Sequence, residues 1–383
     1  MTKQPSYRFM SYIEPWEEKK LGNLGSVEMC RRIFKEETSA EFEIPFFKIG
    51  TFGGEADTYI TREKFEEYKT KFAYPQRGDL LLSASGSIGR VVEYDGDEAY
   101  YQDSNIVWLN HHGKINNKFL KAFYEIVSWS GIEGTTIKRL YNKNILETDI
   151  SLPSLPEQTA IGSFFQDIDQ LISLQQRKLE VLKEQKKTYL KLLFPAKGQT
   201  KPDLRFAGFE DEWKEVKLGD FVEISKGIQR NKEFLSPNAD SKNCYPVYNG
   251  GKQESGYTDE FNREGNIMIS EGGASAGFVN YFDGKYWSGG HNFTIDELEN
   301  DINYVLALLE SQQQELYSLQ VGSGLPNIQL NSLKKVIITF PAFLEQQAIG
   351  SFFQDLDKAI AKQEEKVNQL KESKQTLLRK MFI

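Results

Sequence analysis

The most regular hydrophobic pattern of the chain occurs in two segments, residues 157–194 and 345–382. In each segment, apolar side chains recur at alternating steps of four and three residues, the seven-residue repeat of a helix that packs against another helix. Both segments lack proline and are rich in Leu, Lys, Glu and Gln, which favour helix. The pattern therefore predicts two helices of 38 residues, each about 57 Å long.

The two predicted helices share an apolar seam and the polar residues that interrupt it. Gln175 and Lys186 take seam positions in the first helix, and Gln363 and Lys374 take the same positions in the second. A polar side chain in a seam usually fixes the register, so Gln175 is expected to face or nearly face Gln363 in an antiparallel coiled coil. The alternative is an ordinary amphipathic helix that packs on its own domain. The seam comprises Ile161, Phe165, Ile168, Ile172, Gln175, Leu179 and Leu182, and Ile349, Phe353, Leu356, Ile360, Gln363, Val367 and Leu370.

The chain contains an internal duplication. The two helical segments align without a gap at an offset of 188, with 21 identities in 38 positions. The phrase at residues 8–22 recurs at residues 205–219, where Arg-Phe, Trp and Leu-Gly are retained. The central parts of the two halves align only weakly, and Asn105 corresponds there to Asn292 at an offset of 187. We infer a duplicated unit that is alike at its ends and diverged in its middle.

The regions before the helices show the pattern of strands and turns. Short apolar runs bounded by Gly, Asp and Asn occur at residues 79–83, 90–94 and 266–270. The expected fold class is α+β, with two strand-rich domains separated by two long helices and a pseudo-twofold internal repeat. The expected boundaries are a first domain at 1–152, a helical spacer at 153–197, a second domain at 198–340 and a second spacer at 341–383.

Charge alone does not indicate a nucleic-acid partner, because the formal net charge is −8. Local potential matters more than net charge, and basic residues gather in short runs. Polar glycine-containing loops at residues 83–90 and 270–277 could bring the backbone close to a phosphate. The same sequence pattern is also typical of a tight turn between two strands. Each basic residue could equally be a solvated surface charge. The candidate DNA contacts are Arg31, Arg32, Lys35, Ser85, Ser87, Arg90, Lys138, Arg139, Lys226, Gln229, Arg230, Lys232, Ser275, His291 and Asn292.

Other classes of site find little support in the sequence. Cys30 and Cys244 form no CxxC pair, and three histidines are too few and scattered for a metal site. The sequence lacks a Walker phosphate loop, an Asn-Pro-Pro-Tyr or Asp-Pro-Pro-Tyr motif and a glycine-rich methionine-cofactor loop, so no catalytic residue is expected. We expect a cytoplasmic protein without a membrane partner, because no long apolar run or secretory signal is present.

The arrangement resembles the specificity subunits of type I restriction-modification systems along the whole chain. The most specific likeness is Pro156-Glu157-Gln158 leading into a helix with IGSFFQDID, and its counterpart FLEQ at residues 343–346. The phrase PDLRFAGFEDEWKEVKLGD at residues 202–220 is similar to the opening of a target-recognition domain, whereas the first copy lacks the Pro-Asp-Leu.

The resemblance implies that each globular domain reads one half of a bipartite, asymmetric double-stranded DNA target. The helix pair would set the spacing between the halves and dock two modification subunits, and restriction subunits would join them. This chain would bind no cofactor, and S-adenosylmethionine, ATP and Mg would belong to the partner subunits. It would therefore be the non-catalytic subunit of a DNA methyltransferase and endonuclease complex.

Three other functions stay open at this point. The chain could be a methyltransferase or nuclease in its own right, which DNA methylation by the purified chain alone would reveal. It could be a structural adaptor whose coiled coil carries two ligand-binding domains, which absence of DNA binding in the presence of methyltransferase subunits would favour. Specificity subunits of related type II systems share the same architecture.

Overall fold

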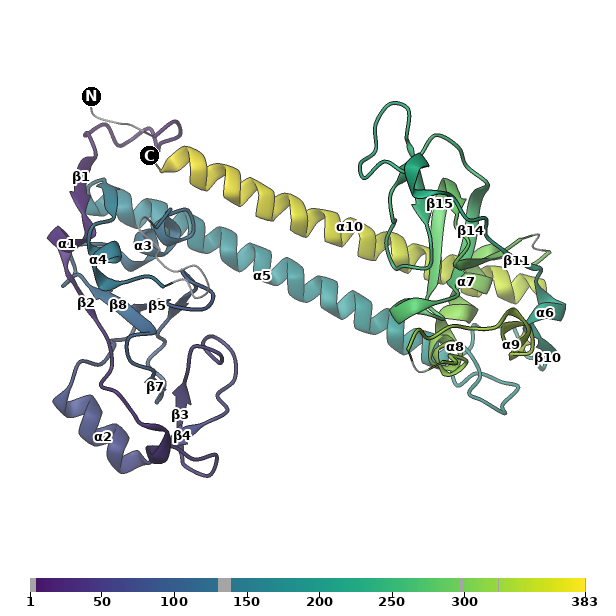
Figure 1. The fold of residues 1–383 in the computed structure, drawn as a ribbon, viewed down its shortest axis with the longest axis horizontal. Helices are drawn as coiled ribbons and strands as arrows, with labels where there is room; N and C mark the ends of the chain where they lie inside the picture. Colours follow the sequence, from purple (N-terminus) through teal and green to yellow (C-terminus); the bar gives the residue numbers. More distant parts are fainter. Residues whose placement is uncertain (1–4, 130–138, 297–298, 323, 383) are drawn as a thin grey trace. The chain divides into compact units, whose positions relative to one another are not determined.

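The computed structural model describes residues 5–129, 139–296, 299–322 and 324–382. The chain divides into two compact units (Figure 1). Unit 1 comprises Met1–Gln175 with Lys366–Ile383, and unit 2 comprises Gln176–Glu365. Each unit therefore contains a globular domain and a part of both long helices.

Unit 1 is built from three small sheets. The largest has the strand order β2-β8-β5-β6, all antiparallel, and its central strands β5 and β8 are buried along almost their whole length. A second sheet, β4-β3-β7, combines one antiparallel and one parallel pair, and β1 pairs with β9. The strands are β1 (Glu17–Lys20), β2 (Ser26–Glu28), β3 (Ile44–Phe47), β4 (Tyr59–Ile60), β5 (Leu80–Ser83), β6 (Val91–Glu93), β7 (Tyr100–Tyr101), β8 (Ile106–Asn110) and β9 (Asp149–Leu152). The helices are α1 (Leu21–Leu24), η1 (Lys35–Glu37), α2 (Arg62–Lys71), α3 (Asn117–Tyr124) and α4 (Asn142–Leu146).

Unit 2 repeats the plan with a larger main sheet. Its strand order is β11-β16-β14-β15-β12-β13, and β10 pairs with β17. The strands are β10 (Lys214–Lys217), β11 (Ile224–Lys226), β12 (Tyr245–Tyr248), β13 (Tyr257–Thr258), β14 (Arg263–Ser270), β15 (Val279–Ser288), β16 (Asn292–Ile295) and β17 (Ile337–Phe340). The helices are α6 (Leu218–Phe221), η2 (Lys232–Phe234), η3 (Gly273–Ser275), α7 (Ile302–Ser311), α8 (Gln313–Ser318) and α9 (Leu330–Lys334).

The α+β fold class and the internal repeat are confirmed. The order β2-β8-β5-β6 of unit 1 corresponds to β11-β16-β14-β15 of unit 2, and β1 with β9 corresponds to β10 with β17. The three strands expected from the apolar runs are β5, β6 and β14. Parallel pairing of β3 with β7 and of β12 with β15 was not visible in the sequence, because it depends on residues far apart in the chain.

The similar opening phrases of the two halves form the same buried ion pair. The Arg8 guanidinium donates two hydrogen bonds of 2.7 Å to the Glu157 carboxylate, which has no exposed side-chain surface. Arg205 and Glu345 repeat both distances in unit 2. The hydrogen bonds with Glu157 raise the pKa of Arg8 above its usual value, so the guanidinium stays charged. The phrases that carry the family resemblance therefore join the start of each domain to the start of its helix.

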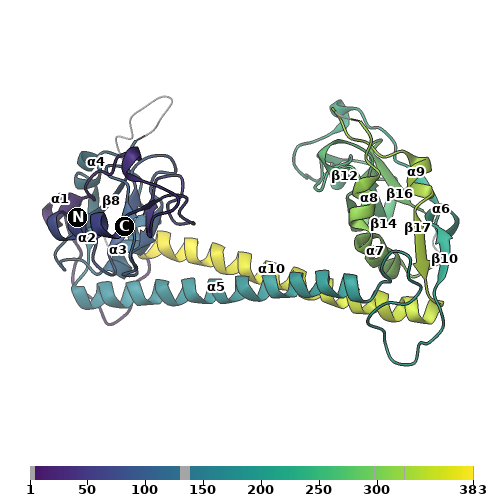
Figure 2. The same cartoon turned by 90° about the horizontal axis from the view of Figure 1, so that it is seen from below.

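The two long helices are α5 (Leu155–Leu192) and α10 (Phe343–Met381). In unit 1, Asp169 of α5 pairs with Lys374 of α10. In unit 2, Lys186 pairs with Asp357, and the rings of Tyr189 and Phe352 lie 5.0 Å apart. Residue numbers rise along one helix as they fall along the other, so the helices pack antiparallel in both units (Figure 2).

The seam positions lie on the covered side of each helix. In unit 1, Ile161, Phe165, Ile172 and Val367 are buried, and Ile168 and Leu370 are half-buried. In unit 2, the buried seam residues are Leu179, Ile349, Phe353 and Gln363. The half-buried ones are Leu182, Leu356 and Ile360. Gln175 belongs to unit 1 and Gln363 to unit 2, so their mutual approach stays a prediction.

One glycine in each long helix permits close packing of the globular domain. A Cβ atom at Gly162 would lie 2.6 Å from the backbone nitrogen of Phe119 in α3. A Cβ atom at Gly350 would lie 2.2 Å from Oδ1 of Asp301, the residue that caps α7. The glycine of the shared IGSFFQD phrase therefore brings the first turn of α3 or α7 against the long helix.

Candidate nucleic-acid interface

In unit 1, the candidates Ser85 and Arg139 come together with residues 104 and 105 beyond the ends of β5 and β8. Ser85 forms a β-bridge with Arg139, and its hydroxyl donates to Oδ1 of Asn105 at 2.8 Å. The Arg139 guanidinium donates to the carbonyl of Ser104 at 3.0 Å. Ser104 has φ = 52°, a left-handed conformation that few residues other than glycine adopt. The cluster therefore presents an amide, a hydroxyl and a guanidinium on neighbouring loops.

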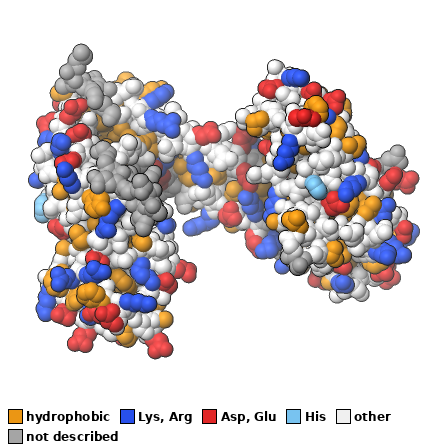
Figure 3. Space-filling view, viewed as in Figure 1, with side chains coloured by type: hydrophobic (Ala, Val, Ile, Leu, Met, Phe, Trp, Pro, Cys, Tyr) orange, Lys and Arg blue, Asp and Glu red, His pale blue; other side chains and the backbone are white. Residues whose placement is uncertain are grey.

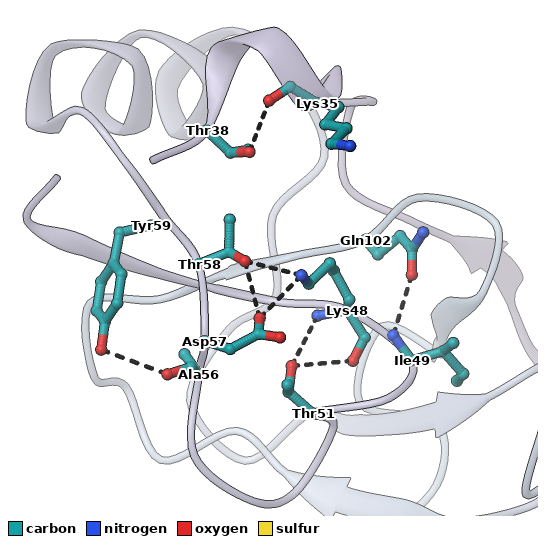
Figure 4. A network of polar contacts seen from close by, with 10 residues as sticks. All are labelled: Lys35, Thr38, Lys48, Ile49, Thr51, Ala56, Asp57, Thr58, Tyr59 and Gln102. Carbon is teal, nitrogen blue, oxygen red and sulfur yellow. Dashed lines mark hydrogen bonds and ion pairs between the residues drawn. The ribbon is translucent and has the colours of Figure 1, made fainter. Parts of the chain in front are cut away.

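A loop spanning residues 48–58, drawn in Figure 4, is bonded to the turn at residues 83–90 that carries Ser85. The Lys48 amine contacts the Asp57 carboxylate at 2.8 Å and the Thr58 hydroxyl at 2.7 Å. The Gln102 side chain accepts a hydrogen bond of 3.0 Å from the backbone nitrogen of Ile49. The exposed Arg90 guanidinium donates to the carbonyl of Gly53 in the same loop at 3.1 Å. These bonds hold the loop beside the turn at residues 83–90.

In unit 2, the corresponding cluster is centred on Glu271. Its carboxylate lies 2.7 Å from the Lys226 amine and 3.8 Å from Nδ1 of His291. The backbone nitrogen of His291 donates to Oδ1 of Asn249 at 3.2 Å. A Cβ atom at Gly290 would lie 2.9 Å from Oε1 of Gln229, which places that side chain beside the same glycine turn. Lys226, Gln229 and His291 are therefore brought together by β11, β12 and β16.

The two clusters occupy equivalent positions on a shared backbone frame. The backbone nitrogen of Ala84 donates a hydrogen bond to the carbonyl of Asn105. In the same way, the backbone nitrogen of Glu271 donates to the carbonyl of His291. The bridge between Ser85 and Arg139 likewise has its counterpart between Gly272 and Asn327. The expected match of Asn105 with Asn292 is therefore shifted by one residue, since Asn292 pairs with Ser270 as Ile106 pairs with Ser83. One frame thus carries different side chains in the two units.

Two candidates of unit 2 have structural partners within their own domain. The Arg230 side chain, 12% exposed, pairs with Asp259 and Glu260 and lies 4.5 Å from the centre of the Trp287 ring. Asn292 is buried, and its amide donates to the carbonyl of Tyr248 at 2.6 Å. Both side chains are thus held away from solvent in this conformation.

The other candidates lie apart from these contacts or outside the described residues. Arg31 packs over the Phe72 ring and Arg32 over the Phe34 ring, each at 5.3 Å. Lys35 begins the short helix η1 (Figure 4). Lys138 lies outside the described residues. The exposed or half-exposed remainder comprises Ser87, Lys232 and Ser275.

Sequence reasoning missed several polar residues of these surfaces. Asn105 and Gln102 in unit 1, and Asn249, Glu271 and Asn327 in unit 2, belong to the clusters but to no basic run. Amides and carboxylates are side chains that can bond to base edges in the major groove. The available signal was their position near a strand end or a glycine-containing turn, which is too common to single them out.

The surface offers mixed charge rather than a metal-ligand set. On the face drawn in Figure 3, Lys and Arg side chains are interspersed with Asp and Glu over both units. Among the described residues, no group of His, Cys, Asp and Glu has the arrangement of a metal site. None of the helices in the described ranges has the length and apolar character that a bilayer crossing requires. The chemistry on display is hydrogen bonding and charge, which suits recognition.

The fold defines a class of protein with two like domains on a shared helix pair, and comparison with known proteins identifies the family. Residues 13–184 and 210–372 each match the type I restriction modification DNA specificity domain. The chain belongs to this family and carries two copies of its domain.

Individual relatives agree with this assignment. A Haemophilus influenzae protein named as a type I restriction enzyme specificity subunit is 50% identical over 153 residues, which is 40% of each chain. The first curated relatives are thus matched over about two fifths of their length. The Methanocaldococcus jannaschii type I restriction enzyme MjaVIII specificity subunit is 23% identical, over 79% of this chain and 74% of that protein. The crystal structure of the S subunit from M. genitalium shares the fold, with a TM-score of 0.67 at 18% identity, covering 100% of this chain and 99% of that one.

Proposed function

We propose that this chain is the specificity subunit of a type I restriction-modification complex, in which units 1 and 2 each read one half of a bipartite, asymmetric DNA target. The shared backbone frame with different side chains carries the proposal. Asn105 and Arg139 in unit 1 stand where His291 and Asn327 stand in unit 2. Since base edges are distinguished by the donors and acceptors that meet them, two unlike sets would select two unlike half-sites.

The partners follow from the duplicated helices. Two helix segments that share 21 of 38 residues offer two similar surfaces, which suits two copies of one modification subunit. Restriction subunits would complete the complex, and S-adenosylmethionine, ATP and Mg would be bound by the partners. This chain would then supply recognition and spacing without turning over a substrate itself.

Domain exchange tests the proposal. Residues 1–152 are replaced by the corresponding domain of another specificity subunit, and the methylated sequences are mapped by methylome sequencing of cells that contain the modification subunits. The expected result is a bipartite motif in which one half changes and the other half is retained. A simultaneous change in both halves, or a motif without two parts, would contradict independent reading by the two units.

The non-catalytic role is tested with the purified chain. We expect neither methylation of DNA, nor cleavage, nor ATP hydrolysis without partner subunits, and methylation after the modification subunits are added. Turnover that co-purifies with this chain through several columns would overturn this part of the proposal.

A further inference from the structure

A buried lysine in unit 1 bridges three elements. The Lys374 amine of α10 lies 2.5 Å from Oδ1 of Asp169 in α5 and 2.6 Å from the carboxylate of Glu125, which follows directly after α3. The lysine side chain is 9% exposed, whereas the two carboxylates are 40% and 29% exposed. One ammonium group therefore joins both long helices and the end of α3, a helix of the globular domain of unit 1.

Unit 2 contains the same arrangement with the helices exchanged. The Lys186 amine of α5 lies 2.8 Å from Oδ1 of Asp357 in α10 and 2.7 Å from Oε2 of Glu310 in α7. Lys186 and Asp357 are the counterparts of Lys374 and Asp169 at the offset of 188. The two triads are thus one feature, present twice.

Each lysine comes from the helix that follows the other domain in the sequence. Lys374 follows the second domain but bonds beside α3 of the first, and Lys186 follows the first domain but bonds beside α7 of the second. We propose that Lys374 and Lys186 are positioning residues, each of which fixes the orientation of the opposite repeat's recognition domain on the helix pair. The proposal deepens the proposed function and rests on it for its DNA readout.

The geometry gives the lysines this role because each ammonium group contacts one long helix and the end of one domain helix while it belongs to the other long helix. A slip of the helices by one heptad would move the ammonium about 10 Å along the axis, away from both carboxylates and against apolar seam residues. A rotation of α3 or α7 on the helices would separate the lysine from Glu125 or Glu310 and leave a largely buried charge with fewer partners. An apolar residue at either position would tolerate both movements.

Amide hydrogen exchange on the full chain tests the positioning role directly. Lys374→Met keeps the length and apolar stem of the side chain but removes the charge. We expect exchange in α3 to accelerate about tenfold while α7 is unchanged, and the reverse for Lys186→Met, since breaking a partly buried pair loosens the element it holds. Lys183→Met is the matched control, because the Lys183–Glu364 pair joins the same two helices with side chains 44% and 46% exposed. Unchanged exchange in α3, or equal acceleration in α3 and α7, would overturn the proposal.

Methylation by the assembled complex supplies a readout that a merely structural role would not move. Targets carry one base change in either half, or a spacer altered by one base pair. Lys374→Met should relax discrimination in the half read by unit 1 and tolerate the altered spacer, with the other half retained. If Lys374→Met and Lys186→Met both discriminate between the altered targets as well as the unaltered complex does, the proposal is overturned. If the unaltered complex reads no bipartite target, the proposed function fails instead, and the exchange experiment still decides the positioning role.

Discussion

Replacing Glu157 by Gln tests the ion pair that closes unit 1. The carboxylate accepts two bonds of 2.7 Å from Arg8 and one of 3.3 Å from the indole nitrogen of Trp16. Gln supplies one acceptor oxygen and turns an NH2 group toward a guanidinium N–H, so one charge-assisted bond becomes a contact between two donors. A charge-assisted bond contributes about 1.5–3 kcal/mol, and the fully buried position adds the cost of an incompletely paired Arg8. We expect the free energy of unfolding of unit 1 to fall by about 2–4 kcal/mol.

Unit 2 provides a matched comparison. Glu345→Gln removes the same pair with Arg205, but the indole nitrogen of Trp213 has no hydrogen-bond partner among the described residues. The loss in unit 2 should therefore be smaller by about 0.5–1 kcal/mol, the value of one further hydrogen bond. Glu67→Gln is the control, because its pair with Lys71 is exposed and should contribute less than about 0.5 kcal/mol.

Native-state hydrogen exchange measures both effects, since it reports protection in each unit separately, whereas a single melting temperature would mix the two units. The amides of β5 report on unit 1 and those of β14 on unit 2. Glu157→Gln should lower protection in β5 and leave β14 as an internal reference. If the free energy of protection in β5 falls by less than about 1 kcal/mol, or falls equally in β5 and β14, the Arg8–Glu157 pair does not stabilise unit 1 specifically.

Three further outcomes follow from the structure. Gly350→Ala should destabilise unit 2 by about 1–3 kcal/mol, because its Cβ atom would lie 2.2 Å from the capping carboxylate of Asp301; unchanged hydrogen-exchange protection of β14 would contradict this packing. At pH 8, a thiol reagent should modify Cys244 rapidly and Cys30 only after unfolding, since Cys244 is exposed whereas burial raises the pKa of Cys30 to about 12; two fast-reacting thiols in the native chain would count against this. Insertion of four residues near the middle of both α5 and α10 should lengthen the spacer of the methylated motif by methylome sequencing, and altered half-site bases with an unaltered spacer would remove the ruler role.

The sequence by itself determined the periodic and repeated features of this protein. A seven-residue apolar repeat predicts a helix wherever it occurs, so the structure places α5 and α10 within about two residues of the expected segments. Alternating runs likewise predicted β5, β6 and β14. Comparison of the two halves showed the duplication, because neighbouring residues carry that signal along the chain.

The tertiary structure decided which polar side chains support the fold and which face outward. Arg230 and Asn292 are typical DNA-binding residue types, yet the first lies over the Trp287 ring and the second is buried and bonded to a carbonyl of β12. Glu271 belongs to no basic run, but it joins Lys226 to His291. For Asn292 and Lys226, these partners lie 44 and 45 residues away in the chain, so composition and local spacing carry no information about them.

The same distinction applies to the seam lysines. Lys186 and Lys374 are visible in the sequence as interruptions of a heptad, and such interruptions indicate a register-fixing role without naming the partner. Only the folded units show that the partners are Asp357 with Glu310 and Asp169 with Glu125. The heptad is a property of one helix, whereas a buried charge is satisfied by whatever the packing of several elements brings within hydrogen-bonding distance.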